Sequence, residues 1–157
     1  MISFTVYGVP APAGSKRGFY NKKAKRVIVT DDSKRSRPWK ALVSDAAIEA
    51  MGNEAPGLMD GPLELRLCFV VPRPKGHFGS GRNAGRVRDS APVFPAVKPD
   101  LLKLARAVED ALSGIVYRDD AQIVKETLDK QYGSPARCEV RVYEITESMY
   151  TDRKEVA

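Results

Sequence analysis

Three aspartates flank one short stretch of this chain, and their side chains could bind a metal ion. Residues 98–122 read KPDLLKLARAVEDALSGIVYRDDAQ, with Asp100 near the start and Asp119 and Asp120 near the end. Carboxylate oxygens are the ligands that Mg²⁺ prefers, and one or two of them leave positions for water and for a substrate phosphate. The residue types are those that a phosphodiester nuclease needs.

These aspartates can meet only if the chain folds back on itself. A helix of about a dozen residues is roughly 18 Å long, so the segment after Gly114 must return along it, and IVYRDD offers such a return. The alternative interpretation is structural. In that case Asp119 and Asp120 form a turn, Asp110 faces solvent and Asp100 caps the helix with its side-chain oxygen.

Two of the elements that position these residues are expected to be helices. In the first, Ser36 can act as the cap, Pro38 lies in the first turn, and apolar residues recur at helical spacing until Gly52. In the second, over residues 101–112, apolar side chains line one face, and Gly114 ends the helix.

Strands are expected on both sides of the helices. Residues 2–7 and 63–71 alternate apolar and polar side chains with the period of a strand. Residues 121–132 and 137–145 are two further strands of less certain register, and residues 19–30 form a basic hairpin that turns near Asn21 to Ala24. The fold class is therefore α+β, with a mixed sheet of about four strands packed by two main helices.

One domain is expected over residues 1–147, followed by a polar tail at residues 148–157. The chain has 157 residues, of which 43% are apolar, so it can bury a core of its own. Residues 73–99 are rich in Gly, Pro and Arg without any apolar period. This stretch is either a long functional loop or a disordered linker.

The positive charge is concentrated in two segments. The net charge is +6, and we expect a polyanion as the partner. The predicted DNA contacts are Lys16, Arg17, Lys22, Lys23, Lys25 and Arg26 near the hairpin, and Lys75, Arg82, Arg86 and Arg88 in the long loop, where Phe78 could stack on an unpaired base. The alternative is that the charged run is a solvated face.

Several classes of protein and site are excluded or not indicated. Cys68, Cys138 and His77 are too few for a zinc site with four protein ligands, and a disulfide between the two cysteines stays open. No Walker loop, nucleophile elbow or dinucleotide fingerprint occurs, so we expect no organic cofactor. Because no apolar run or leader is seen, we expect no membrane association and a cytoplasmic location.

The segment KPDLLKLARAVEDALSGIVYRDDAQIV resembles the signature of the RusA family of Holliday junction resolvases, PDLDNLxKxxxDALxGxxxxDDxQ. The segments PAPAGSKRGF and RPKGHFGSGRNAG are similar to phage and prophage members of that family, so for a phage protein the location would be the bacterial host cytoplasm. The resemblance implies a small α+β domain that forms a homodimer and binds four-way or other branched DNA. It also implies Mg²⁺, with Mn²⁺ as a substitute, held by aspartates for symmetric cleavage.

The resemblance assigns roles residue by residue. Asp100 matches the first catalytic aspartate and Asp120 the third, with Asp119 as a supporting carboxylate, and these three are the expected metal ligands. Arg106 occupies the position of the catalytic lysine, and its guanidinium stabilises charge but is a poor proton donor. Leu102 occupies the position of the second catalytic aspartate and cannot bind a metal.

Glu109 could compensate for Leu102. It lies seven residues further on, about 20° away around the helix axis and roughly 10 Å along it. The hypothesis is that the two positions have exchanged roles, with an apolar side chain at Leu102 and the metal-binding carboxylate at Glu109. The alternative is that Glu109 pairs with Arg106 at i, i+3 or is solvated.

The function expected from the sequence is Mg²⁺-dependent resolution of Holliday junctions by a crossover junction endodeoxyribonuclease, in DNA recombination and repair. Two alternatives stay open. One is a junction-binding protein with impaired catalysis, and the other is a nuclease for other branched DNA.

Overall fold

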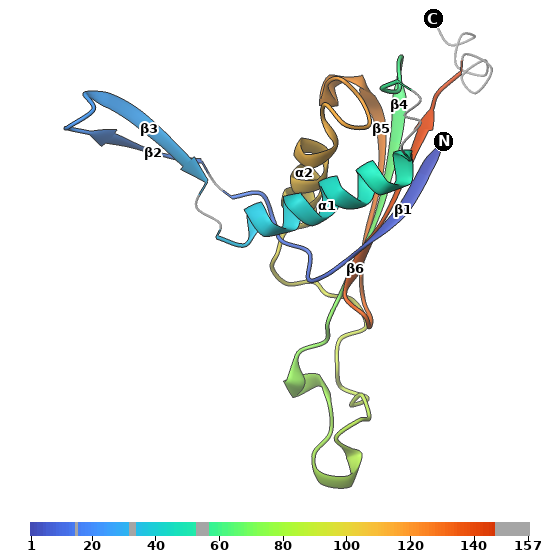
Figure 1. The fold of residues 1–157 in the computed structure, drawn as a ribbon. Coiled ribbons are helices and arrows are strands. Elements are labelled where there is room, and N and C mark those ends of the chain that lie inside the picture. Colours follow the sequence, from blue (N-terminus) through green and yellow to red (C-terminus); the bar gives the residue numbers. More distant parts are fainter. Residues whose placement is uncertain (15, 32–33, 53–56, 147–157) are drawn as a thin grey trace, which may run out of the picture.

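The computed structural model describes residues 1–14, 16–31, 34–52 and 57–146. Its main sheet has four strands in the order β1-β6-β4-β5 (Figure 1). They are β1 (Ile2–Tyr7), β4 (Leu63–Val71), β5 (Ile123–Tyr132) and β6 (Arg137–Glu144). β6 is antiparallel to β1 and β4, whereas β4 and β5 are parallel. This confirms the expected mixed sheet and places β5 at one edge.

Two helices pack against one face of this sheet (Figure 1). They are α1 (Ser36–Met51) and α2 (Leu101–Leu112). Leu63, Leu65, Leu67 and Phe69 of β4 alternate toward the helices and are fully or almost fully buried. The sequence period of two therefore identified the central strand correctly. Burial of this apolar face is the main favourable term in folding.

The opposite face of the sheet is polar. The Glu64 carboxylate accepts a 2.7 Å hydrogen bond from Arg66 Nε and lies 3.2 Å from Lys125 Nζ. Cys68 lies on this polar face, whereas Cys138 is in the core, beside Phe69 of β4. Both cysteines are free thiols because they lie on opposite faces of the sheet.

The start of α1 differs from the prediction. Arg35 occupies the N-cap position and already has near-helical backbone angles, φ −91° and ψ −17°. Ser36 is therefore not the cap but the first residue of the helix, and it is fully buried. Lys40 Nζ donates a 2.6 Å hydrogen bond to Asp110 Oδ2, which ties α1 to α2.

The basic hairpin forms a small sheet of its own and projects from the body of the molecule (Figure 1). Its strands are β2 (Lys16–Asn21) and β3 (Arg26–Asp31). Asn21 Oδ1 accepts hydrogen bonds from the backbone N–H of Lys23 and Ala24, an arrangement that favours a tight turn. The turn lies where the sequence predicted it. The side chains of Lys16 and Arg17 lie outside the described residues, as does the tail at 148–157.

The long loop at residues 73–99 has local structure that its sequence did not indicate. Two single turns of 3₁₀ helix, Lys75–His77 and Gly81–Asn83, stand on either side of a β-bridge between Phe78 and Val87. Arg88 Nε donates a 2.7 Å hydrogen bond to Phe78 O. The loop projects beyond the end of the sheet (Figure 1).

No helix in the described parts of the chain is long and apolar enough to cross a membrane.

Candidate active site

Helix α2 carries two of the predicted site residues, Arg106 and Glu109, and Asp100 directly precedes it. Leu104, Ala105, Val108 and Leu112 are buried against the sheet and α1. Leu102 and Arg106 are exposed on the other side, and Glu109 follows them at the half-buried boundary. At 100° per residue these last three lie within about 60° of each other around the helix axis.

The chain after α2 makes a tight return. Gly114, at φ +78°, allows the turn, and its N–H donates to Tyr117 O at 2.7 Å. The fully buried Tyr117 donates its hydroxyl to Glu109 O at 3.1 Å, and its burial raises the pKa of the phenol. The segment is thereby fastened to the end of α2.

Asp119 caps the short 3₁₀ helix Asp120–Gln122. Its Oδ1 accepts a 2.8 Å hydrogen bond from Ala121 N–H, and Gln122 completes a capping box. The Gln122 amide also donates to the backbone oxygens of Met59 and Gly61. These contacts hold Asp120 beside the C-terminal end of α2.

Strand β5 then runs back along α2. Glu126, Leu128 and Lys130 share the face of β5 that lies toward the helices, because their neighbours on β4 are Leu65, Leu67 and Phe69. Lys130 Nζ donates to Val97 O at 2.8 Å and to Pro99 O at 2.9 Å. The far end of β5 is therefore beside the start of α2.

Three carboxylates line one cavity of about 440 Å³, which we call the acidic cavity. They are Glu109 from α2, Asp120 from the return segment and Glu126 from β5. Burial of the Glu109 side chain, then its hydrogen bond with Glu126, raises the pKa of Glu109 to about 8. The negative charges of Glu126, Asp120 and Asp110 add to this effect.

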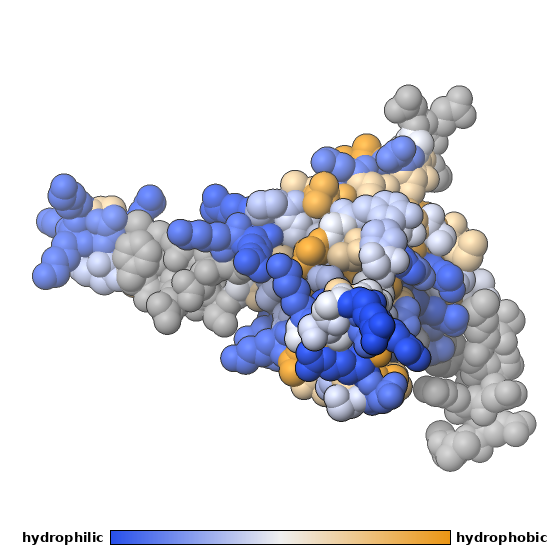
Figure 2. All heavy atoms as spheres, turned by 90° about the horizontal axis from the view of Figure 1, so that it is seen from below, coloured by the Kyte–Doolittle hydropathy of each residue, from blue (hydrophilic) through white to orange (hydrophobic). Residues whose placement is uncertain are grey.

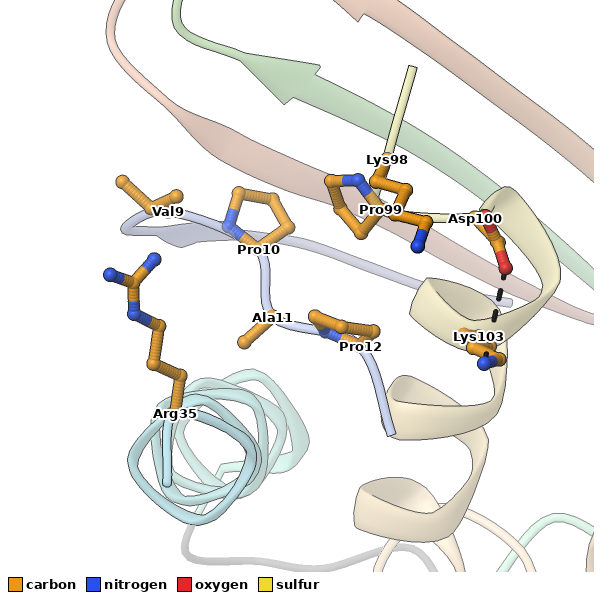
Figure 3. A pocket seen from close by; sticks show the side chains of 9 residues that line it. All are labelled: Val9, Pro10, Ala11, Pro12, Arg35, Lys98, Pro99, Asp100 and Lys103. Carbon is orange, nitrogen blue, oxygen red and sulfur yellow. Dashed lines mark ion pairs between the residues drawn. The ribbon is translucent and has the colours of Figure 1, made fainter. Parts of the chain in front are cut away.

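Asp100 lies in a second cavity of about 830 Å³, which we call the proline cavity. Figure 3 shows its walls, formed by the segment after β1, the residue before α1 and the start of α2. Asp100 holds the N-cap position of α2 without a side-chain capping bond, and its Oδ2 is 4.0 Å from Lys103 Nζ. The lining residues are Val9, Pro10, Ala11, Pro12, Arg35, Lys98, Pro99, Asp100 and Lys103.

The structure thus brings together only some of the predicted site residues. Asp120 and Glu109 line the same cavity, whereas Asp100 lines the other. Asp119 uses one carboxylate oxygen as a cap. Arg106 is exposed and, among the described residues, forms no ion pair with Glu109. The chain does fold back along α2, but the part that reaches the helix start is the end of β5.

Glu126 was not among the site residues predicted from the sequence. Its neighbour two positions on is the apolar Leu128, so a strand period of two would have placed Glu126 on the core side. In the fold Glu126 is exposed at the acidic cavity, and its carboxylate hydrogen-bonds with that of Glu109. The alternation with Leu128 is visible in the sequence, but the position of Glu126 opposite Leu65 depends on the register between β4 and β5.

The donor set of the acidic cavity fits a hard cation. Mg²⁺ is commonly held by one or two carboxylates plus water and substrate phosphate, and Glu109, Asp120 and Glu126 line this cavity. Within the described ranges, no three acidic, His or Cys side chains are close enough to hold a metal ion together. The fit therefore concerns an ion shared with a bound phosphate, not an ion enclosed by protein.

Exposed cations lie on the two extensions of the molecule, the hairpin and the long loop (Figure 1). Lys22, Lys23, Lys25 and Arg26 are exposed on the hairpin, and Lys75, Arg82, Arg86 and Arg88 are exposed on the long loop. Figure 2, seen from the end where the loop projects, shows hydrophilic side chains over both extensions. Phe78 is half-buried in the bridge with Val87 and is less available for stacking than predicted.

Comparison with known proteins identifies the family. The family model for Endodeoxyribonuclease RusA matches residues 10–143, which include α1, α2, the acidic cavity and every lining residue of the proline cavity except Val9. The chain is also 30% identical over 145 residues to the uncharacterized protein YqaN of Bacillus subtilis (strain 168). The aligned region covers 92% of this chain and 97% of that relative. The protein belongs to the RusA family of endodeoxyribonucleases, as its aspartate signature indicated.

Proposed function

We propose that the protein is a Mg²⁺-dependent, structure-specific endodeoxyribonuclease that resolves Holliday junctions by paired phosphodiester hydrolysis in recombination and repair. Family membership supports the reaction class. The observation that carries the site assignment is the acidic cavity, where Asp120 and Glu109 meet Glu126. The exposed lysines and arginines of the hairpin and the loop support a polyanionic substrate.

In this proposal one or two carboxylates of the acidic cavity, Asp120 with Glu109 or Glu126, would share the ion, or Mn²⁺ in its place, with water and a DNA phosphate. When bound, the ion stabilises negative charge on the phosphodiester oxygens as a Lewis acid. Glu109 holds a proton in the ion-free cavity at neutral pH, since its pKa is about 8, and it must release that proton to act as an anionic ligand. Arg106, exposed on the same side of α2, faces the charge that develops on the phosphate.

Asp100 and Asp119 remain proposed site residues with narrower roles. Asp100 is exposed, and its carboxylate has a long contact of 4.0 Å to Lys103, so it can approach DNA bound at the start of α2. Asp119 orients Asp120 through the cap of the 3₁₀ helix. A homodimer would place two such sites in two-fold symmetry, which matches the symmetry of a four-way junction.

A second candidate function is junction binding with impaired catalysis. Two observations favour it: Leu102 is 71% exposed where the resemblance expects an aspartate, and Asp100 and Asp120 lie in different cavities. In that case the basic surface would hold the junction without cutting it.

Cleavage of labelled DNA separates these candidates. We would compare a four-way junction, a fork and a matched duplex in Mg²⁺, using the wild type, Asp120→Asn, Asp100→Asn and the control Asp45→Asn, an exposed aspartate of α1. Paired nicks in the junction that are lost only in the site variants would support the resolvase. Faster cutting of the fork indicates a nuclease for other branched DNA, and tight binding without cutting by any protein indicates a binding function.

A further inference from the structure

We infer that the proline cavity binds one unpaired nucleotide of the DNA, with the base against its apolar wall and the flanking phosphates on its cations. This inference rests on the proposed function, because it takes branched DNA as the substrate. It concerns a site separate from the acidic cavity, since the two cavities share no lining residue.

The apolar wall is built before any ligand binds. Pro10 and Pro12 restrict the backbone on one side, and Ala11 between them is only 3% exposed. The segment is fastened at both ends, because Gly8 N–H donates to Ala136 O at 3.0 Å and Ala13 N–H donates to Lys103 O at 2.8 Å. A preformed wall lowers the entropy cost of binding.

Val9 leaves part of this wall open to solvent. Its side chain is 59% exposed, and Figure 3 places it at the rim beside Pro10 and above Arg35. When a flat, weakly hydrated ring covers a concave apolar surface, water is displaced from both and the free energy falls. A nucleobase has such a ring.

Cations surround the wall on the remaining sides. Arg35 comes from the residue before α1, whereas Lys98 and Lys103 come from the start of α2, with Asp100 as the one anion. Within the described part of the chain, Arg35 and Lys98 form no ion pair. The Lys103–Asp100 contact is 4.0 Å long and exposed, so it is weak and leaves Lys103 available.

Both helices also begin at this cavity. α1 starts directly after Arg35 and α2 directly after Asp100. The first N–H groups of a helix carry partial positive charge and attract phosphate. Together with the three basic side chains they favour an anionic backbone at the rim.

The shape indicates an unpaired nucleotide and not a duplex. A volume of about 830 Å³ exceeds what a phosphate needs and lies within the range of pockets that enclose small organic molecules. A base inside a duplex cannot enter a concave site, whereas a base beside a branch point is unpaired or easily unstacked. α2 is about 18 Å long, so the bound base would lie a few nucleotides from a phosphate at the acidic cavity.

The test uses full-length protein and a four-way junction with 2-aminopurine placed in turn at the positions near the branch. Binding is measured in EDTA, so that cutting does not occur, by fluorescence anisotropy for affinity and by 2-aminopurine emission for unstacking. The variants are Val9→Asp and Arg35→Gln. The matched controls are Ile48→Asp, another exposed apolar residue, and Arg37→Gln, another exposed arginine of the same region.

We expect one position near the branch to change its emission at least twofold with the wild type. Val9→Asp should abolish that change and weaken junction binding at least fivefold, with less than twofold effect on duplex binding, and Arg35→Gln should weaken junction binding at least threefold. The controls should stay within twofold of the wild type. Melting temperatures close to the wild type would show that Val9→Asp is folded.

Four results would overturn the inference. If no position changes its emission, no base enters the cavity. If Arg35→Gln weakens binding and Val9→Asp does not, the cavity is only a phosphate contact. If the wild type cuts junctions in Mg²⁺ and both variants bind them normally, the nucleotide site is refuted while the proposed function stands. If the wild type does not bind junctions, both the nucleotide site and the proposed function are refuted.

Discussion

The ionisation of Glu109 gives a quantitative test of the acidic cavity. Its pKa is raised from the usual 4.5 to about 8, so between these values the folded state binds a proton that the unfolded state has released. Stability therefore falls as the pH rises through this window. The penalty is absent below about pH 4.5 and complete above about pH 8.

The size of the effect follows from the same values. A pKa of about 8 in place of 4.5 corresponds to about 5 kcal/mol at 1.36 kcal/mol per factor of ten. Glu109 is only half-buried, and solvent screens its neighbours, so we reduce this to about 2 kcal/mol. Glu109→Gln should remove the penalty, making the variant about 2 kcal/mol more stable than the wild type at pH 8.5 and nearly equal to it at pH 4.5.

Urea unfolding in EDTA measures this difference. The single tryptophan, Trp39, is 2% exposed and reports on the core by fluorescence. Glu49→Gln, an exposed glutamate of α1, is the control and should follow the wild type at every pH. Parallel pH curves for the wild type and Glu109→Gln would refute the reasoning, because Glu109 would then ionise alike in both states.

Four further perturbations test the helix and the basic surface. Leu104→Ala should cost 2–5 kcal/mol in urea unfolding because Leu104 is fully buried, whereas Leu102→Ala, at an exposed position, should stay within about 0.5 kcal/mol. Leu102→Asp should fold normally and raise the Mg²⁺-dependent cutting rate of a labelled junction; an unchanged or lower rate would argue against a missing ligand. Replacing Arg82 and Arg86 by Gln should reduce the slope of log affinity against log salt by about 2, and an unchanged slope would show that these residues do not contact phosphates.

The helix–sheet framework could be predicted because its residues repeat with clear periods. Leu63, Leu65 and Leu67 alternate with polar residues, and the apolar face of α2 recurs at helical spacing. Such periods report directly which side of an element is buried. The start of α1 was predicted less well, because Ser36 has the residue type of a cap while the backbone of Arg35 is already helical.

The arrangement of the site could be predicted only in part. The sequence predicted Asp120 and Glu109 as site residues, but not that Glu126 lines the same cavity, since this depends on the register between β4 and β5. The proline cavity combines Val9 to Pro12 with residues near Asp100, about ninety positions later in the chain. No local pattern encodes that proximity, and only the packing of the segment after β1 against α2 creates it.

The long loop is anchored at its base, so a change in its length at the tip need not disturb the rest of the fold. Arg73 donates a 2.8 Å hydrogen bond to Pro92 O, which joins the first part of the loop to the last part. Lys130 donates to the backbone oxygens of Val97 and Pro99 and so fixes the end of the loop to β5. The tip around Gly81 to Asn83 lies away from the sheet and the two helices (Figure 1), and none of its residues is buried. Doubling a flexible loop costs only about 0.6 kcal/mol in closure entropy. The tip is therefore a natural point for insertion, where relatives could acquire new substrate preferences and where a reporter peptide could be grafted without disturbing the folding of the domain.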